Sequence, residues 1–146
     1  MTTTGAQTYT GPLTLNANTS TFTTTSNGAV TFAGDIAKGS GVTSNLTVSS
    51  GSGNVSFNGV TGISSTPIGA LSVTSTGTTS LAGAFYATSI SKSGSGSTAI
   101  SGGTVRTSGS QSYAGVVDIS GTTTMSSTGT GNLTYSGAIS NSAQSN

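Results

Sequence analysis

The sequence predicts an all-β chain that coils as a β-solenoid and contains little or no helix. Three observations support this class: apolar residues alternate with polar ones, turn-forming residues separate the alternating segments, and stretches of the chain repeat. Repetition favours a solenoid over a sandwich or a barrel, because a solenoid stacks equivalent strands and lengthens by copying. At roughly 20–26 residues for each three-stranded coil, the 146 residues give about six or seven coils.

The alternating segments each place an apolar residue on both sides of one Thr, Ser or Asp. A strand with this pattern buries one face and exposes the other. Clusters such as SNG at 26–28 and GSG at 51–53 separate the segments, and Gly and Asn suit turns because they tolerate positive φ. No window combines helical spacing with suitable caps. The apolar pairs are Leu13/Leu15, Val30/Phe32, Leu46/Val48, Val55/Phe57, Leu71/Val73, Val117/Ile119 and Leu133/Tyr135.

We therefore expect short strands that follow one another about every eight to ten residues. Thr and Ser should cover the outer faces, the apolar pairs should stack inside, and Gly should occupy the corners. In chain order, the expected strand centres are Tyr9, Leu15, Phe22, Phe32, Val48, Phe57, Val73, Leu81, Ile90, Ile100, Tyr113, Ile119, Met125 and Tyr135.

A long repeat links the two ends of the chain. Residues 5–17 match residues 109–121 at an offset of 104 positions, and residues 22–36 match 125–139 after a deletion of one residue. We interpret the chain as a single solenoid unit, 1–146, with one copy over 1–104 and a partial second copy over 105–146. The matching structural positions are Gly5/Gly109, Gln7/Gln111, Tyr9/Tyr113 and Gly11/Gly115.

The composition argues against several functional classes. The charged residues are Asp35, Lys38, Lys92, Arg106 and Asp118, and His, Cys and Glu do not occur, so general acid–base chemistry and zinc binding lack their usual groups. We expect neither an enzyme nor a bound cofactor. A net charge of +1 does not favour nucleic acid, and no apolar run approaches the ~20 residues that insertion into a membrane needs.

Three stretches carry a family resemblance: GAQTYTGPLTLNANTSTFTTTSNGAVTFAGDI, PIGALSVTSTGTTSLAGAF at 67–85 and TVRTSGSQSYAGVVDISGTTTM at 104–125. They resemble the adhesin repeats of filamentous-haemagglutinin-type exoproteins, large bacterial proteins of two-partner secretion. The resemblance implies a right-handed parallel β-helix, an extracellular or bacterial cell-surface location and no catalysis. The family's amino-terminal secretion domain and a signal peptide are not recognisable in the sequence, so we expect a piece of a longer protein or an unusual stand-alone unit.

The repeated Gln–Tyr pair has two interpretations. Gln7 with Tyr9 and Gln111 with Tyr113 could form a sugar-binding pair used twice, but two sites several coils apart cannot converge on one small ligand. We favour a structural role, in which Gln forms hydrogen bonds along the ladder and Tyr packs at a corner. For contact with a surface partner, the candidates are Tyr86 and Tyr113.

Three further patterns favour structure over function. Asn-X-Ser/Thr sequences arise by chance in a chain so rich in Ser and Thr, the Thr triplets are too irregular for ice binding, and the GGxGxD motif of calcium-binding repeats is absent. The residues concerned are Asn18, Asn45, Asn54 and Asn132, the triplets 2–4, 23–25 and 122–124, and the carboxylates Asp35 and Asp118.

Three functional hypotheses follow. The first is a structural shaft segment of a secreted or cell-surface bacterial adhesin, which provides a rigid scaffold for attachment. The second is a module that binds glycans or a host surface. The third is a filament subunit that associates with itself through the solenoid ends, since unpaired strand edges invite further pairing.

Overall fold

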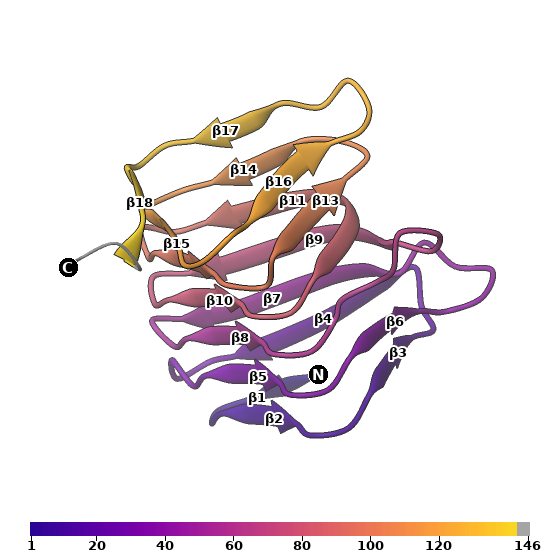
Figure 1. The fold of residues 1–146 in the computed structure, drawn as a ribbon. Helices are drawn as coiled ribbons and strands as arrows, with labels where there is room; N and C mark the ends of the chain where they lie inside the picture. The colour runs from indigo at the N-terminus through magenta and orange to yellow at the C-terminus, as the bar shows by residue number, and fades with distance from the viewer. Residues whose placement is uncertain (143–146) are drawn as a thin grey trace.

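The computed structural model describes residues 1–142 and is a β-solenoid of about six turns (Figure 1). All 18 strands belong to this one stack, and residues 1–142 contain no α-helix. The predicted all-β solenoid is therefore confirmed. Every expected strand centre, from Tyr9 to Tyr135, lies within a strand.

The chain passes through three faces in each turn, which we number in the order in which the chain meets them. The first face contains β1 (Thr2–Thr3), β4 (Thr19–Thr24), β7 (Asn45–Gly51), β9 (Ile68–Ser75), residues 87–93 of β11 (Phe85–Ser93), β14 (Gln111–Tyr113) and β17 (Leu133–Tyr135). The second face contains β2 (Gln7–Tyr9), β5 (Val30–Phe32), β8 (Val55–Phe57), β10 (Thr79–Leu81), β12 (Thr98–Ile100), β15 (Val117–Ile119) and β18 (Ile139–Ser140). The third face contains β3 (Leu13–Leu15), β6 (Ile36–Lys38), a bridge at Thr61, residues 85–87 of β11, β13 (Thr104–Thr107) and β16 (Thr124–Ser127).

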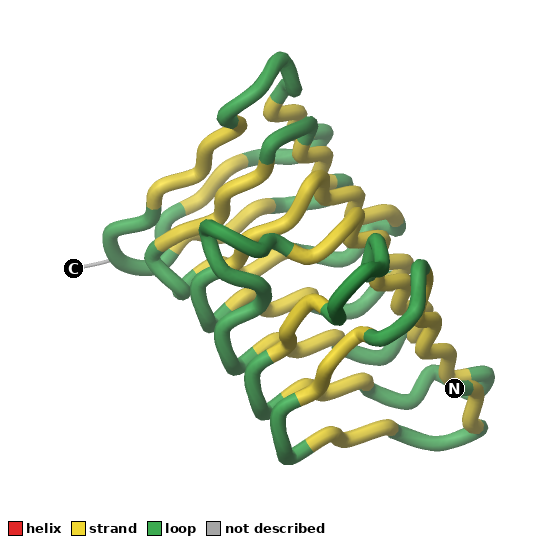
Figure 2. Tube along the Cα trace, turned by 90° about the vertical axis from the view of Figure 1, so that its right-hand side faces the viewer, coloured by secondary structure: helices red, strands yellow, loops and turns green. Residues whose placement is uncertain are grey.

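All pairings between these strands are parallel, and each inner coil is hydrogen-bonded to the coils before and after it (Figure 2). The coils differ in length. Asn27 and Ser52, which are hydrogen-bonded between neighbouring coils, lie 25 positions apart, whereas Thr74 and Ser93 lie 19 positions apart. Loops between the third and first faces lengthen some coils; residues 39–44, for example, separate β6 from β7.

The apolar pairs form one continuous core, as the alternation predicts. Val30 and Phe32 are buried, whereas Thr31 between them is partly exposed. Aromatic rings continue from coil to coil inside the second face. Phe32 stacks on Tyr9 with ring centroids 5.3 Å apart, and Phe57 stacks on Phe32 at 5.2 Å. The stacked coils therefore share a single interior instead of forming separate cores.

Glycine ladders line two corners where successive coils approach closely. At the corner between the second and third faces, a Cβ added to Gly83 would overlap the Gly59 carbonyl oxygen. At the corner between the first and second faces, a Cβ on Gly96 would overlap the Gly77 oxygen. Because no side chain fits at either position, the backbones can meet here only at glycine.

Candidate functional site

The first Gln–Tyr pair belongs to a hydrogen-bonded corner that also includes a threonine. The Thr3 hydroxyl donates to the Gly5 carbonyl oxygen at 2.7 Å, and Gln7 Nε2 donates to Thr3 Oγ1 at 3.1 Å. Gln7 Nε2 also donates to the carbonyl of Thr23 in β4 at 2.7 Å. The Tyr9 hydroxyl completes the network by donating to Gln7 Oε1 at 2.9 Å.

The second copy reproduces this network. The Thr107 hydroxyl donates to the Gly109 carbonyl oxygen at 2.5 Å, and Gln111 Nε2 donates to Thr107 Oγ1 at 3.2 Å and to the Ser126 carbonyl at 2.9 Å. The Tyr113 hydroxyl donates to Gln111 Oε1 at 2.9 Å. The threonine was missed in the sequence analysis, although Thr3 and Thr107 are also 104 positions apart. We call this unit of Thr, Gly, Gln and Tyr the Gln–Tyr corner.

The glycines that follow the two tyrosines do not have equivalent backbones. Gly115 has a φ of +81°, in the left-handed region that favours glycine, whereas Gly11 has no positive φ. A Cβ on Gly115 would overlap the Gly96 carbonyl oxygen, but a Cβ on Gly11 would meet nothing within 4 Å. The expectation that Gly11 and Gly115 are matching structural positions is therefore wrong in conformation and contacts. The contacts differ because Gly115 packs on an earlier coil, which Gly11 lacks within residues 1–142.

The two Gln–Tyr corners lie on different faces of the solenoid. Gln7 and Tyr9 lie on the second face, whereas Gln111 and Tyr113 lie on the first. The strands that follow shift in the same way, because β3 lies on the third face and β15 on the second. The long repeat therefore reproduces a corner and its strands, but places them one face earlier in the coil.

Both glutamines and Tyr113 are buried, which contradicts one of the two surface candidates. Tyr113 has no exposed surface, and burial raises the pKa of its hydroxyl above the ordinary range. The Tyr113 ring stacks inside the core on Tyr135, with centroids 5.7 Å apart. The expectation that Tyr113 contacts a partner at the surface is wrong, because its side chain points into the solenoid. Tyr86 remains partly exposed.

A loop interrupts the third face and forms the concave surfaces around Tyr86. After Thr61 the chain turns outward at Gly62, whose φ is +64°, and a short antiparallel bridge joins Ile63 to Thr66. The loop lies across the outside of the third face and reaches the strand that carries Arg106, which donates from Nη1 to Ser64 Oγ at 2.8 Å. We call residues 62–67 the third-face loop.

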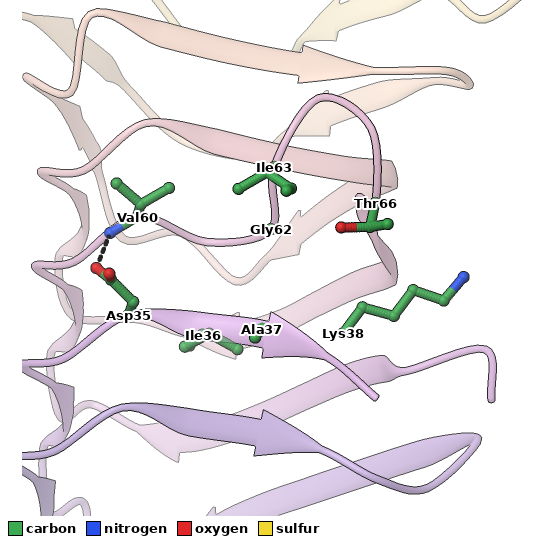
Figure 3. A pocket seen from close by; sticks show the side chains of 8 residues that line it. All are labelled: Asp35, Ile36, Ala37, Lys38, Val60, Gly62, Ile63 and Thr66. Carbon is green, nitrogen blue, oxygen red and sulfur yellow. Dashed lines mark hydrogen bonds between the residues drawn. The ribbon is translucent and has the colours of Figure 1, made fainter. Parts of the chain in front are cut away.

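Three hollows flank this loop, and the third of them, of about 410 Å³, lies between residues 65–67 of the loop and residues 38–41. One, of about 190 Å³, lies between β6 and the loop, with Val60 and Ile63 on one side and Ala37 on the other (Figure 3). Asp35 and Lys38 stand at its two ends, and Asp35 Oδ1 accepts the Val60 N–H at 2.8 Å. The second, of about 90 Å³, is lined by residues that include Ser64, Pro67, Tyr86 and Arg106.

Three of the five charged side chains thus lie around one loop: Asp35, Lys38 and Arg106. Two of them also hold the loop in place, because Asp35 accepts the N–H of Val60 just before it and Arg106 donates to Ser64 within it. Sequence reasoning missed this gathering because the residues are distant in the chain; Arg106 and Ser64, for example, are 42 positions apart.

Lys92 is a buried cation held by backbone oxygens. It occupies a core position between Val73 and Tyr113, and its Nζ donates to the carbonyls of Gly94 at 3.0 Å, Gly96, and Ala114 at 3.4 Å. Burial lowers the pKa of its ammonium group. With its donors directed at the corner, Lys92 fills a structural position.

The two aspartates lie apart and contact different coils. Asp118 Oδ1 accepts hydrogen bonds from Ser140 Oγ and Ser142 N, each at 3.0 Å, and these bonds lower the pKa of the carboxyl group. The asparagine side chains behave similarly, since Asn45 and Asn54 accept backbone N–H groups of the next coil. In residues 1–142 no group of three or more potential metal ligands occurs, and no helix is long and apolar enough to cross a membrane.

The fold and these surfaces define the chain as a β-solenoid with one decorated face. No family model, curated protein or solved structure matches it. The resemblance to filamentous-haemagglutinin-type repeats therefore stays a prediction.

Proposed function

We propose that the chain is a shaft segment of a secreted or cell-surface bacterial adhesin, which holds an attachment site at a distance from its anchor. The observation that carries the proposal is the uninterrupted parallel pairing along the second face, from β2 to β18. Each coil in such a ladder stabilises its neighbours, so the rod stays stiff and lengthens by copying. Seven strands at a spacing of about 4.8 Å give a rod about 29 Å long.

Tandem copies of the full chain test the mechanical part of the proposal. We expect the maximum dimension from small-angle X-ray scattering to rise by a constant increment for each added copy. Copies that fold back on one another, or move as beads on a flexible string, would contradict a shaft. Antibodies against residues 1–146 should label intact cells of the source organism as strongly as permeabilised cells, and label confined to permeabilised cells would contradict the surface location.

A second candidate function is the binding of glycans or a host surface at the third-face loop. Its support is the group of Tyr86, Arg106 and Ser64 beside a hollow, because an aromatic ring next to a guanidinium group suits a sugar that carries a carboxylate or sulfate. Tyr86 and Arg106 are register partners on adjacent strands, which fixes their relative position. Because the site depends on one loop, added coils elsewhere in the solenoid would leave it unchanged.

An array of neutral and acidic glycans tests this second function. We expect binding to acidic glycans that Tyr86→Ala and Arg106→Ala each reduce at least tenfold. Thr21→Ala is the matched control, because Thr21 is exposed on the first face, away from the loop. An array without hits, or equal binding by Tyr86→Ala and Thr21→Ala, would contradict the function.

A further inference from the structure

The two ends of the solenoid leave strand edges and core residues uncovered. Within residues 1–142, no strand pairs with the outer edge of β2 at one end or of β17 at the other (Figure 1). The core residues of these coils are correspondingly more exposed. Tyr9 and Tyr135 are only partly buried, whereas Phe32 and Tyr113, the partners on which they stack, are fully buried.

The chain itself shows what fits against the uncovered edge of β2. The second Gln–Tyr corner has the same hydrogen bonds as the first, but a further coil lies beneath it: Ile90 and Lys92 of β11 are the register partners of Gln111 and Tyr113. A Gln–Tyr corner therefore accepts a strand on its outer edge without loss of its internal network. The first corner differs in having no such strand within residues 1–142.

The opposite end of the solenoid offers a matching strand. In β17, Leu133 and Tyr135 point inward and Thr134 points outward, which is the arrangement of residues 90–92 beneath the second corner. The coil dimensions agree as well. The first coil, from Gln7 to Val30, is only one residue longer than the coil that ends at β17, from Gln111 to Leu133.

We propose that a second copy of this chain docks its first coil on the last coil of the first copy, turned by one face. In this arrangement β2 pairs with β17, β3 with β18 and β1 with β16. The turn follows from the long repeat, which places the second Gln–Tyr corner one face earlier than the first. The inference rests on the proposed shaft function and deepens it, because docking extends the same ladder between molecules.

The side chains at the junction continue ladders that already exist in each copy. Tyr9 of the second copy comes to lie over Tyr135 of the first, which joins the Tyr113–Tyr135 stack to the Tyr9–Phe32 stack. Interplanar angles of 12° and 13° show that both stacks have nearly parallel rings. No charged side chain occurs on the six strands involved, so no like charges on them oppose the contact.

The glycine corners continue across the same junction. When Tyr9 lies over Tyr135, the next glycine of the second copy, Gly11, lies over Gly137 of the first. Within one chain, Gly137 already packs on the backbone of Gly115, and Gly34 packs on the backbone of Gly11. Both glycines at the junction thus lack the side chain that would hold two coils apart, and the space beside Gly11 is open.

The backbone groups needed for pairing point toward the junction. Gln7 donates its N–H to Ala29 and Tyr9 accepts from Ala33, both within the chain. In a strand, alternate residues direct their backbone groups to opposite sides, so the N–H and C=O of Thr8 face away from β5. On β17, Ser136 donates to Tyr113, so the groups of Tyr135 face the uncovered side.

Cysteine pairs test both the docking and the turn, and the chain contains no cysteine of its own. Thr8 and Thr134 become neighbours only if the second copy is turned by one face, whereas Thr8 would face Ser140 if it were not. Neighbouring parallel strands bring Cα atoms within the range that a disulfide allows. We expect Thr8→Cys/Thr134→Cys to form disulfide-linked multimers under a mild oxidant, and Thr8→Cys/Ser140→Cys to form no disulfide between copies.

Disulfide-linked multimers from Thr8→Cys/Ser140→Cys alone would show that the second copy docks without the turn by one face. Disulfide-linked multimers from neither variant would contradict the docking itself. A third variant, Ser112→Cys/Thr134→Cys, joins register partners within one chain and serves as the control for the fold. If it forms its disulfide while the first two form no disulfide between copies, the docking fails and the shaft proposal stands. If it fails to form, the strand register is wrong and both proposals fall.

Proline at the edge gives an independent measurement. Thr8→Pro removes the N–H that faces the junction but no bond to β5, since edge strands tolerate proline on their open side. We expect Thr8→Pro to sediment as a monomer at concentrations where the natural chain and Thr8→Ala form larger species. Equal association of Thr8→Pro and Thr8→Ala would overturn the proposal.

Discussion

Two buried threonines on the second face are positions where a core substitution should raise the free energy of unfolding, although most core substitutions lower it. Thr79 and Thr98 are register partners, with Val55 before them and Val117 after them in the ladder. Their exposed fractions are 2% and 0%, and neither hydroxyl has a hydrogen-bond partner. Each site therefore has the shape of valine but carries the cost of a buried, unsatisfied polar group.

Thr98→Val should stabilise the protein. A buried hydroxyl without a partner costs about 1–3 kcal/mol, and valine replaces it with a methyl group of similar size. Allowing for imperfect packing of the new methyl group, we expect the free energy of unfolding to rise by about 1–2 kcal/mol. Thr79→Val should act in the same direction. Because the two residues are neighbours in the ladder, their effects in the double variant need not add.

Urea denaturation followed by circular dichroism measures the effect, with an unchanged slope as the sign that the transition itself is the same. Thr107→Val is the matched control, because Thr107 is equally buried but its hydroxyl bonds to Gly109 and Gln111. We expect the free energy of unfolding of this control to fall by about 1–3 kcal/mol. If Thr98→Val destabilised the protein as much as Thr107→Val does, the reasoning from unsatisfied hydroxyls would be refuted.

Further predictions concern the corners and the buried tyrosine. Gly83→Ala should lower the free energy of unfolding by about 1–3 kcal/mol, because the added Cβ would overlap backbone atoms. Gly11→Ala should change the free energy of unfolding of the monomer little, because nothing lies within 4 Å of the added Cβ. Equal effects of the two variants in urea denaturation would contradict the glycine ladder. Tyr113→Phe should lower the free energy of unfolding by about 1–2 kcal/mol, because it loses the hydrogen bond to Gln111 Oε1. Tyr9→Phe should lower it less, because Tyr9 is partly exposed, and the reverse order would contradict this account. Burial raises the folded-state pKa of Tyr113 above its unfolded value, so the free energy of unfolding should fall as pH rises above about 10. In thermal melts, the melting temperature of Tyr113→Phe should decline less steeply with pH than that of the natural chain. An identical decline would exclude Tyr113 as the cause.

The strands were predictable wherever both inward positions were apolar. Val30 with Phe32 and Val55 with Phe57 are such pairs, and their burial at every second residue is visible in the sequence as an alternation of apolar and polar residues. The strands that were missed lack this pair. In β13, for example, Val105 points inward with Thr107, and a buried threonine cannot be distinguished by its type from the many exposed ones.

The candidate site at the third-face loop was predictable only in part. Tyr86 was identified, but its neighbours were not, because the loop that carries Ser64 reaches past the neighbouring coil to Arg106. The number of coils between two residues depends on coil length, and partners in neighbouring coils lie 19 positions apart in one place and 25 in another. Alternation within a strand says nothing of that length, so contacts between coils could not be derived from it.

The long repeat was recognised, but its rotation depends on the same coil lengths. Copies that match at 104 positions would lie directly above one another only if they spanned a whole number of coils. Gln111 instead lies above Ile90 on the first face, while Gln7 lies below Val30 on the second. The Gln–Tyr corner folds in the same way on either face because its hydrogen bonds are mostly local, between residues two to four apart.

This rotation has a consequence for any array built from the repeat. If each copy begins one face earlier than the copy before it, three copies return to the starting face, and a feature that occurs once in each copy follows a spiral around the rod. The third-face loop with Tyr86 would then appear on every side of a long shaft, whereas a repeat of whole coils would present it on one side only. A rod that approaches a surface from any direction would thus offer at least one copy of the loop, so length and display would arise from the same copying step.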